Sequence, residues 1–139
     1  MAQFFRELAD GCGVARLQIL LIDDDPHLLA SFSAVYRKQP IDLYLAISGF
    51  DSFRILQERP VDVVIVDGNM PGLRGIEVLK IVKNRYPNIL RVLLTGDPDP
   101  IARKGEAGEI HYRFTKPCDP VKLLESIQWA RETEIPQCI

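Results

Sequence analysis

The chain has 139 residues, 47% of them hydrophobic and 26% charged, with a net charge of −2. This length and composition predict one globular domain with a single hydrophobic core. The near balance of charge excludes a broad electrostatic attraction to nucleic acid or to an anionic membrane. No apolar run approaches the roughly 20 residues that span a bilayer, and three widely spaced cysteines fit a reducing, cytoplasmic compartment.

Residues 1–16 precede the first segment that could form a core, and we expect them to be an N-terminal extension. Their large apolar side chains have only rough helical spacing and are Phe4, Phe5 and Leu8. The domain itself is expected over residues 17–134, with a short tail at 135–139.

Five short aliphatic runs predict strands, each followed by a helix. The central run, residues 61–66, is hydrophobic almost throughout and is typical of a strand buried on both faces. The second run is the most polar, which favours a position at the edge of a sheet. The five strands are expected at 18–22, 42–47, 61–66, 89–94 and 110–115.

Apolar residues at helical spacing follow each predicted strand. The first helix is expected to end near Pro40, the second before Pro60 and the third before Pro87, because proline cannot continue a helix. A short fourth helix is expected over 99–107. The last helix carries its inward-facing residues between positions 121 and 130.

Three Asp-Pro pairs mark the starts of helices. In each, the aspartate can accept hydrogen bonds from the free amides of the first turn, and proline takes the first helical position, where it loses no hydrogen bond. The pairs are Asp25-Pro26, Asp99-Pro100 and Asp119-Pro120.

Alternating strands and helices predict a doubly wound α/β domain with five parallel strands and helices on both faces. We expect the flavodoxin-like strand order 2-1-3-4-5. In such a sheet, ligands bind beyond the carboxyl ends of the strands where the order reverses, here between the first and third strands.

Three carboxylates are predicted to meet at that point. Asp23 and Asp24 follow the first strand and Asp67 ends the third. Such groups repel one another at neutral pH and need a cation. Hard oxygen ligands of this kind suit Mg²⁺ or Mn²⁺, with water filling the remaining positions.

Two further side chains open onto the same edge of the predicted sheet. Thr95 ends the fourth strand and Lys116 follows the fifth. A metal, a lysine and a hydroxyl around one carboxylate form a phosphoryl-transfer site, in which the carboxylate attacks phosphorus and the cations neutralise charge on the phosphoryl oxygens.

Four motifs in this order and spacing resemble the response-regulator receiver domain of two-component signalling. They are LLIDDDP, VIVDGNMPG, LLTG and FTKP, and the resemblance extends over roughly residues 17–132. Each motif alone is weak, whereas all four in register are specific.

The resemblance implies that Asp67 is the phosphoacceptor. It further implies that Asp24 binds Mg²⁺ directly, that Asp23 assists largely through water, and that Asn69 offers its backbone carbonyl to the metal. The domain would catalyse only its own phosphorylation and dephosphorylation, and in this sense it is not an enzyme.

The resemblance also assigns the residues that follow the fourth and fifth strands. Thr95 would contact the transferred phosphoryl group, Lys116 would pair with the aspartate or phosphate, and the Lys116–Pro117 peptide bond would be cis. The phosphoryl group would come from a sensor histidine kinase or a phosphotransfer protein. The output protein is not identified by the sequence, and a homodimer is one alternative.

Three departures from the family pattern concern signal readout. Arg113 stands three positions before the lysine, where the family usually has an aromatic switch residue, and Tyr112 precedes it. Cys118 takes a position that is commonly a bulky aromatic. The fourth helix is abbreviated, although together with the fifth strand and the last helix it is expected to form the output face.

Other functions are less favoured by the residues. A phosphohydrolase that turns over an aspartyl phosphate usually carries a general acid two positions after the nucleophile, and this chain has Asn69 there. FMN binding is also less favoured, because the sequence after the first strand is not the loop rich in Ser, Thr and Gly that would bind its phosphate. A further alternative is that the chain is the receiver part of a longer regulator with an output domain.

Overall fold

A computed structural model describes residues 16–96 and 108–133 of the chain. Five parallel strands form one sheet in the order β2-β1-β3-β4-β5. This order confirms the predicted doubly wound fold. The strands are β1 (Leu17–Ile22), β2 (Ile41–Ala46), β3 (Val63–Asp67), β4 (Leu90–Thr95) and β5 (Tyr112–Thr115).

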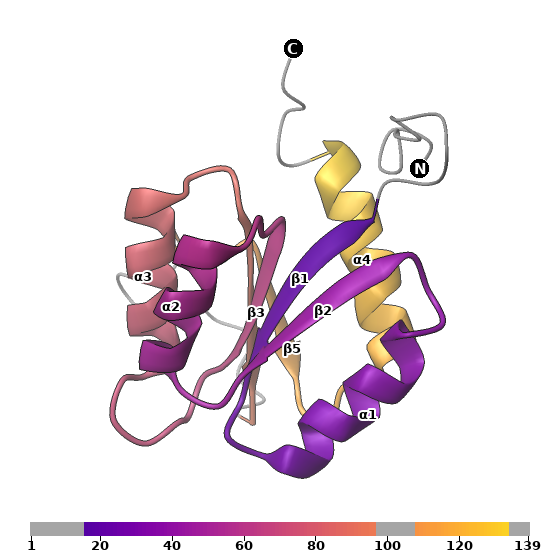
Figure 1. Cartoon of the computed structure of the whole chain (residues 1–139), viewed down its shortest axis with the longest axis horizontal. Coiled ribbons are helices and arrows are strands. Elements are labelled where there is room, and N and C mark those ends of the chain that lie inside the picture. Colours follow the sequence, from indigo (N-terminus) through magenta and orange to yellow (C-terminus); the bar gives the residue numbers. More distant parts are fainter. Residues whose placement is uncertain (1–15, 97–107, 134–139) are drawn as a thin grey trace.

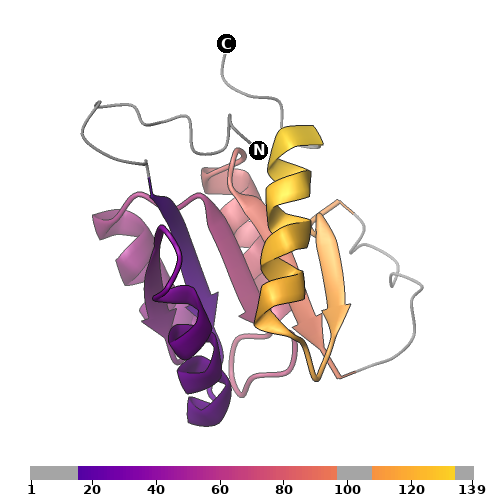
Figure 2. The ribbon, with the colours of Figure 1, turned by 90° about the vertical axis from the view of Figure 1, so that its right-hand side faces the viewer.

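Four helices are described, and they cover both faces of the sheet (Figure 1). They are α1 (Pro26–Tyr36), α2 (Gly49–Glu58), α3 (Gly75–Arg85) and α4 (Pro120–Thr133). The helix predicted over 99–107 falls outside the described residues, so the label α4 belongs to the last predicted helix. Figures 1 and 2 place α1 and α4 on one face and α2 and α3 on the other.

The strands bury side chains on both faces because successive residues point to opposite sides of a strand. In β1, Leu17, Ile19 and Leu21 pack under α1 and α4, whereas Leu20 and Ile22 pack under α2 and α3. β3 is buried throughout, as its continuous apolar run predicts. β2 lies at the edge of the sheet, also as predicted.

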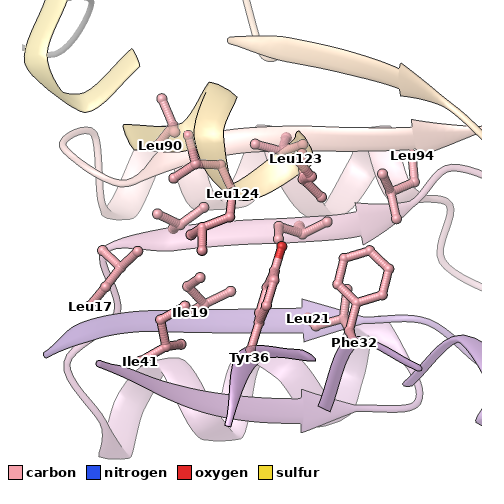
Figure 3. Packing of buried hydrophobic residues seen from close by; sticks show 14 of the residues in the cluster. Leu17, Ile19, Leu21, Phe32, Tyr36, Ile41, Leu90, Leu94, Leu123 and Leu124 are labelled. Carbon is pink, nitrogen blue, oxygen red and sulfur yellow. The ribbon is translucent and has the colours of Figure 1, made fainter. Parts of the chain in front are cut away.

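The core beneath α1 and α4 is organised around two aromatic side chains of α1. Phe32 and Tyr36 meet edge to face with their ring centroids 5.5 Å apart, and both point toward Leu123 and Leu124 of α4 (Figure 3). The buried Tyr36 hydroxyl donates a 2.8 Å hydrogen bond to the carbonyl of Pro120. Burial, with lesser contributions from the nearby charges of Cys118 and Asp119, raises the pKa of Tyr36, so the phenol stays protonated.

Two of the three Asp-Pro pairs start helices as predicted. The Asp25 carboxylate accepts a 2.9 Å hydrogen bond from the amide of His27, with Pro26 at the first turn of α1. The Asp119 carboxylate accepts a 2.9 Å bond from the amide of Val121 at the start of α4. The third pair, at 99–100, falls outside the described residues.

Candidate functional site

The carboxyl ends of β1 and β3 bring three acidic side chains together. The two strands are hydrogen-bonded neighbours, with Ile22 in register with Val66, so the residues that follow them lie side by side. Carboxylate oxygens of Asp23, Asp24 and Asp67 all lie within 4.8 Å of one another. Asp23 is fully buried, Asp67 is 5% exposed, and Asp24 is open to solvent.

Lys116 completes this acidic pocket from the loop that follows β5. Its ammonium lies 3.1 Å from Oδ2 of Asp23 and 3.0 Å from Oδ1 of Asp67. One cation therefore serves two buried carboxylates. With three carboxylates and one ammonium, the formal charge of the pocket is −2, which is the charge that one divalent cation neutralises.

The buried charges alter one another's protonation. Burial raises the pKa of Asp23 and the like charge of Asp67 adds to this rise, while hydrogen bonds from the Asp25 amide and from Lys116 oppose it without cancelling it. Burial alone would lower the pKa of Lys116. Its hydrogen bonds and ion pairs with Asp67 and Asp23 outweigh burial and raise that pKa, so the lysine is held in its charged form.

Backbone amides fix the two buried carboxylates in place. The amide of Asp25 donates to Oδ1 of Asp23 at 2.9 Å, and the amide of Asn69 donates to Oδ1 of Asp67 at 3.2 Å. The amide of Gly68, between Asp67 and Asn69, donates to the carbonyl of Leu94 at 2.7 Å, which ties the end of β3 to β4. Each carboxylate is thus oriented by its own turn.

Oδ2 of Asp67 and the Asp24 carboxylate are left open. Within residues 16–96 and 108–133, neither makes a hydrogen bond or an ion pair. A hard cation prefers such oxygen donors, and Mg²⁺ is typically held by one or two carboxylates with water in its other positions. The donor set therefore fits a divalent metal. Oδ2 of Asp67, which has no hydrogen bond within the described residues, is also suited to act as a nucleophile.

Gly75, the first residue of α3, allows the start of this helix to lie against the end of β3. A side chain at position 75 would collide with the carbonyl oxygen of Asp67 and come within 2.9 Å of the Gly68 Cα. Sequence reasoning missed this contact, although a glycine opening a helix soon after a strand is the signal that could have pointed to it. The close approach fixes the backbone of Asp67.

Thr95 lies at the carboxyl end of β4, next to β3. Its backbone carbonyl accepts a 2.8 Å hydrogen bond from the amide of Lys116, and the peptide bond between Lys116 and Pro117 is cis. The strand ends thus place Thr95 and Lys116 at the same edge of the sheet as Asp67.

The residues that depart from the family pattern lie on different faces of β5. Tyr112 and Phe114 pack against the core under α1 and α4, with their ring centroids 5.8 Å apart. Arg113 is paired in register with Leu93, whose side chain belongs to the opposite face of the sheet. The half-buried Cys118 packs against the same core as Tyr112, and burial, with the nearby Asp119 charge, raises the pKa of its thiol.

An open hollow of about 470 Å³ lies beside Lys116. One wall comes from α1 and the residues before it, including Asp25, His27 and Leu28, and the other from Lys116, Pro117 and Cys118. The hollow therefore lies on the side of Lys116 on which α1 begins.

Comparison with known proteins agrees with this geometry. The model of the response regulator receiver domain family matches residues 19–128. Across 121 aligned residues the chain is 35% identical to the hydrogenase transcriptional regulatory protein HoxA of Cupriavidus necator, covering 84% of this chain and 24% of that protein. It is 28% identical to sporulation initiation phosphotransferase F of Bacillus subtilis, covering 80% of this chain and 90% of the relative.

Solved structures share the same fold. The signal receiver domain of an HD domain-containing protein from Pseudomonas fluorescens Pf-5 superposes with a TM-score of 0.77 at 34% identity, covering 84% of this chain and 95% of that one. The chain spans about a quarter of HoxA and half of the heme response regulator HssR of Staphylococcus aureus. No described helix has the length and apolar character needed to cross a membrane.

Proposed function

Because the chain belongs to the response regulator receiver domain family, we propose that it is a phosphorylation-operated switch whose phosphoacceptor is Asp67. The observation that carries the proposal is the arrangement of the Asp67 carboxylate. Its Oδ1 is held by Lys116 and the Asn69 amide, while Oδ2 makes no hydrogen bond or ion pair within the described residues.

The reaction is a displacement at phosphorus. Oδ2 of Asp67 forms the new bond, the bond from phosphorus to the donor's leaving atom breaks, and the electron pair departs with the donor. Lys116, already 3.0 Å from Asp67, supplies fixed positive charge to the phosphoryl oxygens. Thr95, at the end of the neighbouring strand, supplies a hydroxyl to the transferred group.

Mg²⁺ or Mn²⁺ would be held by Asp23, Asp24 and Asp67, together with the backbone carbonyl of Asn69. Bound there, a divalent ion lowers the cost of bringing an anionic phosphoryl group to a pocket of formal charge −2. Asp24 would bind the ion at the smallest cost of the three, because its exposed carboxylate accepts no hydrogen bond from the part of the chain that the structure describes.

The donor would be a sensor histidine kinase or a phosphotransfer protein, and the hollow beside Lys116 offers the approach. Signal readout would use β5 and α4, with the segment between β4 and β5, through a shift in the population of two conformations. Tyr112 and Arg113 would take part in it. The receiver domain would occupy residues 17–134, between a 1–16 extension and a 135–139 tail, in the cytoplasm.

A second reading concerns the size of the whole protein. The match covers only 24% of HoxA, whose name is that of a transcriptional regulator, so this chain fits the receiver part of a longer regulator. The match to 90% of sporulation initiation phosphotransferase F fits a receiver that acts alone. The chemistry proposed for Asp67 is the same in both.

A titration of Mg²⁺ with and without beryllofluoride, a phosphoryl mimic, tests the site. We expect the mimic and the metal to bind together in the parent chain, and Asp24→Ala to lose the metal. Glu58→Gln, an exposed acid on α2, is the matched control and should bind like the parent. Retained metal affinity in Asp24→Ala would show that the metal lies elsewhere.

A further inference from the structure

A second concave surface lies on the face of the sheet covered by α2 and α3. Two adjoining hollows of about 330 and 280 Å³ share Leu56 and Tyr86 in their walls. We call them together the α2/α3 groove. Phe53 of α2 and Ile81 of α3 line one hollow, and the other extends to the residues that precede β3 and β4. The groove thus reaches the amino end of the sheet, whereas the acidic pocket lies at the carboxyl end.

The groove is apolar with cationic edges. Its walls are mainly aliphatic and aromatic, and among the described residues the charged ones that line it are Arg59 and Arg85. Arg59 lies over the ring of Tyr44, 5.9 Å from the centroid, which orients its guanidinium at the edge. Such a surface suits a short apolar segment that also carries carboxylates.

The first described residues of the chain lie close to this groove. Gln18 and Asp62 are joined by two hydrogen bonds, 2.8 Å from the Asp62 amide to the Gln18 carbonyl and 2.9 Å from the Gln18 amide to the Asp62 carboxylate. Val61, the neighbour of Asp62, lines the groove. Arg16 is anchored beside them by a 2.7 Å ion pair with Asp42.

The fifteen residues before Arg16 have the composition that the groove requires. They include Phe4, Phe5 and Leu8, together with two acids, Glu7 and Asp10, and one base, Arg6. Seven residues separate Leu8 from Arg16, and the eight residue steps between the two can span up to about 28 Å when extended. Because this segment is joined to the domain beside the groove, its effective concentration there is high without any strong intrinsic affinity.

We propose that the N-terminal segment docks its apolar side chains into the α2/α3 groove of its own chain, with its acids near Arg59 and Arg85. The contact would leave both the acidic pocket and the β5/α4 face open, because the groove lies on the other face of the sheet from α4 and at the other end from the acids. Docking is therefore independent of the phosphorylation chemistry.

A spin label tests the proposal through Cys12, which lies within the segment. In a ¹⁵N-labelled full chain with Cys118→Ala and Cys138→Ala, a nitroxide on Cys12 should reduce the amide signals of Phe53, Ile81 and Tyr86. Reduction of the nitroxide should restore them. The triple variant Phe4→Ser/Phe5→Ser/Leu8→Ser should abolish the loss, whereas Arg6→Ser should keep it.

Three outcomes would overturn the proposal. Loss of signal centred on α4, where Trp129 is 56% exposed, would place the segment on the opposite face. Loss that is weak and unchanged by the triple variant would show no docking. The third outcome uses a mixture in which the ¹⁴N chains carry the nitroxide and the ¹⁵N chains do not. Loss of amide signal at the groove in this mixture would show that the occupant is the N-terminal segment of a second copy.

Discussion

Lys116 and Asp23 are 93 positions apart in the sequence, and their charged atoms lie 3.1 Å apart. The contact exists because β1 and β5 run parallel, so that their carboxyl ends lie at the same end of the sheet. Asp67 joins them from β3, with its carboxylate 3.0 Å from the same ammonium. The fold therefore gathers two buried negative charges around one positive charge, and the stability and the chemistry of the pocket depend on that ratio.

Replacing Lys116 with methionine should destabilise the metal-free domain. The change leaves the buried Asp23 and Asp67 carboxylates without their cation, and we expect urea unfolding at pH 7 to show a loss of about 2–3 kcal/mol. The pKa of Lys116 is raised in the folded state. Its stabilising contribution is therefore complete below the unfolded lysine pKa of about 10.4 and is lost as pH rises through the folded value.

The matched control is Lys80→Met, which removes an exposed lysine of α3. It should change the free energy of unfolding by less than about 0.5 kcal/mol. Equal stabilities for the two variants at pH 7 would contradict the structural role given to Lys116.

Replacing Asp23 with asparagine should stabilise the metal-free domain while weakening metal binding. The change leaves one ammonium for one buried carboxylate, and asparagine can still accept the hydrogen bond from the Asp25 amide. We expect the free energy of unfolding at pH 7 without metal to rise by on the order of 1 kcal/mol. Mg²⁺ should stabilise the parent more than the variant.

The pH dependence gives an independent readout of Asp23. Its pKa is raised above 3.8 by burial, so the folded state holds this proton more tightly than the unfolded state does. The resulting stability is present below the unfolded pKa and is lost as pH rises through the folded value. The parent should therefore lose stability relative to Asp23→Asn as pH rises from 3.8. Parallel curves of the free energy of unfolding against pH would contradict the raised pKa of Asp23.

Replacing Gly75 with alanine should displace the backbone of Asp67, although Gly75 itself has no side chain that could take part in the reaction. The added methyl would collide with the Asp67 carbonyl and must push α3 away from the end of β3. We expect a loss of about 1–3 kcal/mol in thermal or urea unfolding and slower labelling of Asp67 by acetyl phosphate. Gly68→Ala is the control, because its added methyl would lie 3.4 Å from its nearest neighbours, in ordinary contact.

Much of the fold followed from the sequence because strand and helix patterns were consistent with one another. The apolar run that leads to Asp67 indicated that β3 is buried on both faces. The acids at the carboxyl ends of β1 and β3 indicated the end of the sheet at which they meet. Asp25 and Asp119 were correctly predicted to begin α1 and α4, because an Asp-Pro pair acts through local geometry. These signals are local, so they can be read without coordinates.

The contacts that the sequence did not reveal are those set by packing between distant segments. Nothing in the pattern of β4 indicates that Arg91 is buried, or that its guanidinium donates to the carbonyls of Glu109 at 2.9 Å and Ile89 at 3.3 Å. The imidazole of His111 accepts a 2.9 Å hydrogen bond from the Arg91 amide. The bond from Tyr36 to Pro120 likewise depends on how α1 meets α4.

The most direct test of the central claim is labelling by a small phosphodonor in the presence of Mg²⁺, with Asp67→Asn beside the parent and Glu58→Gln as a matched acid-to-amide control. We expect the parent and Glu58→Gln to gain a base-labile phosphoryl group and Asp67→Asn to gain none, and we expect chelation of the metal to prevent labelling of all three. Equal labelling of Asp67→Asn, or a parent that takes up no phosphoryl group, would contradict the central claim.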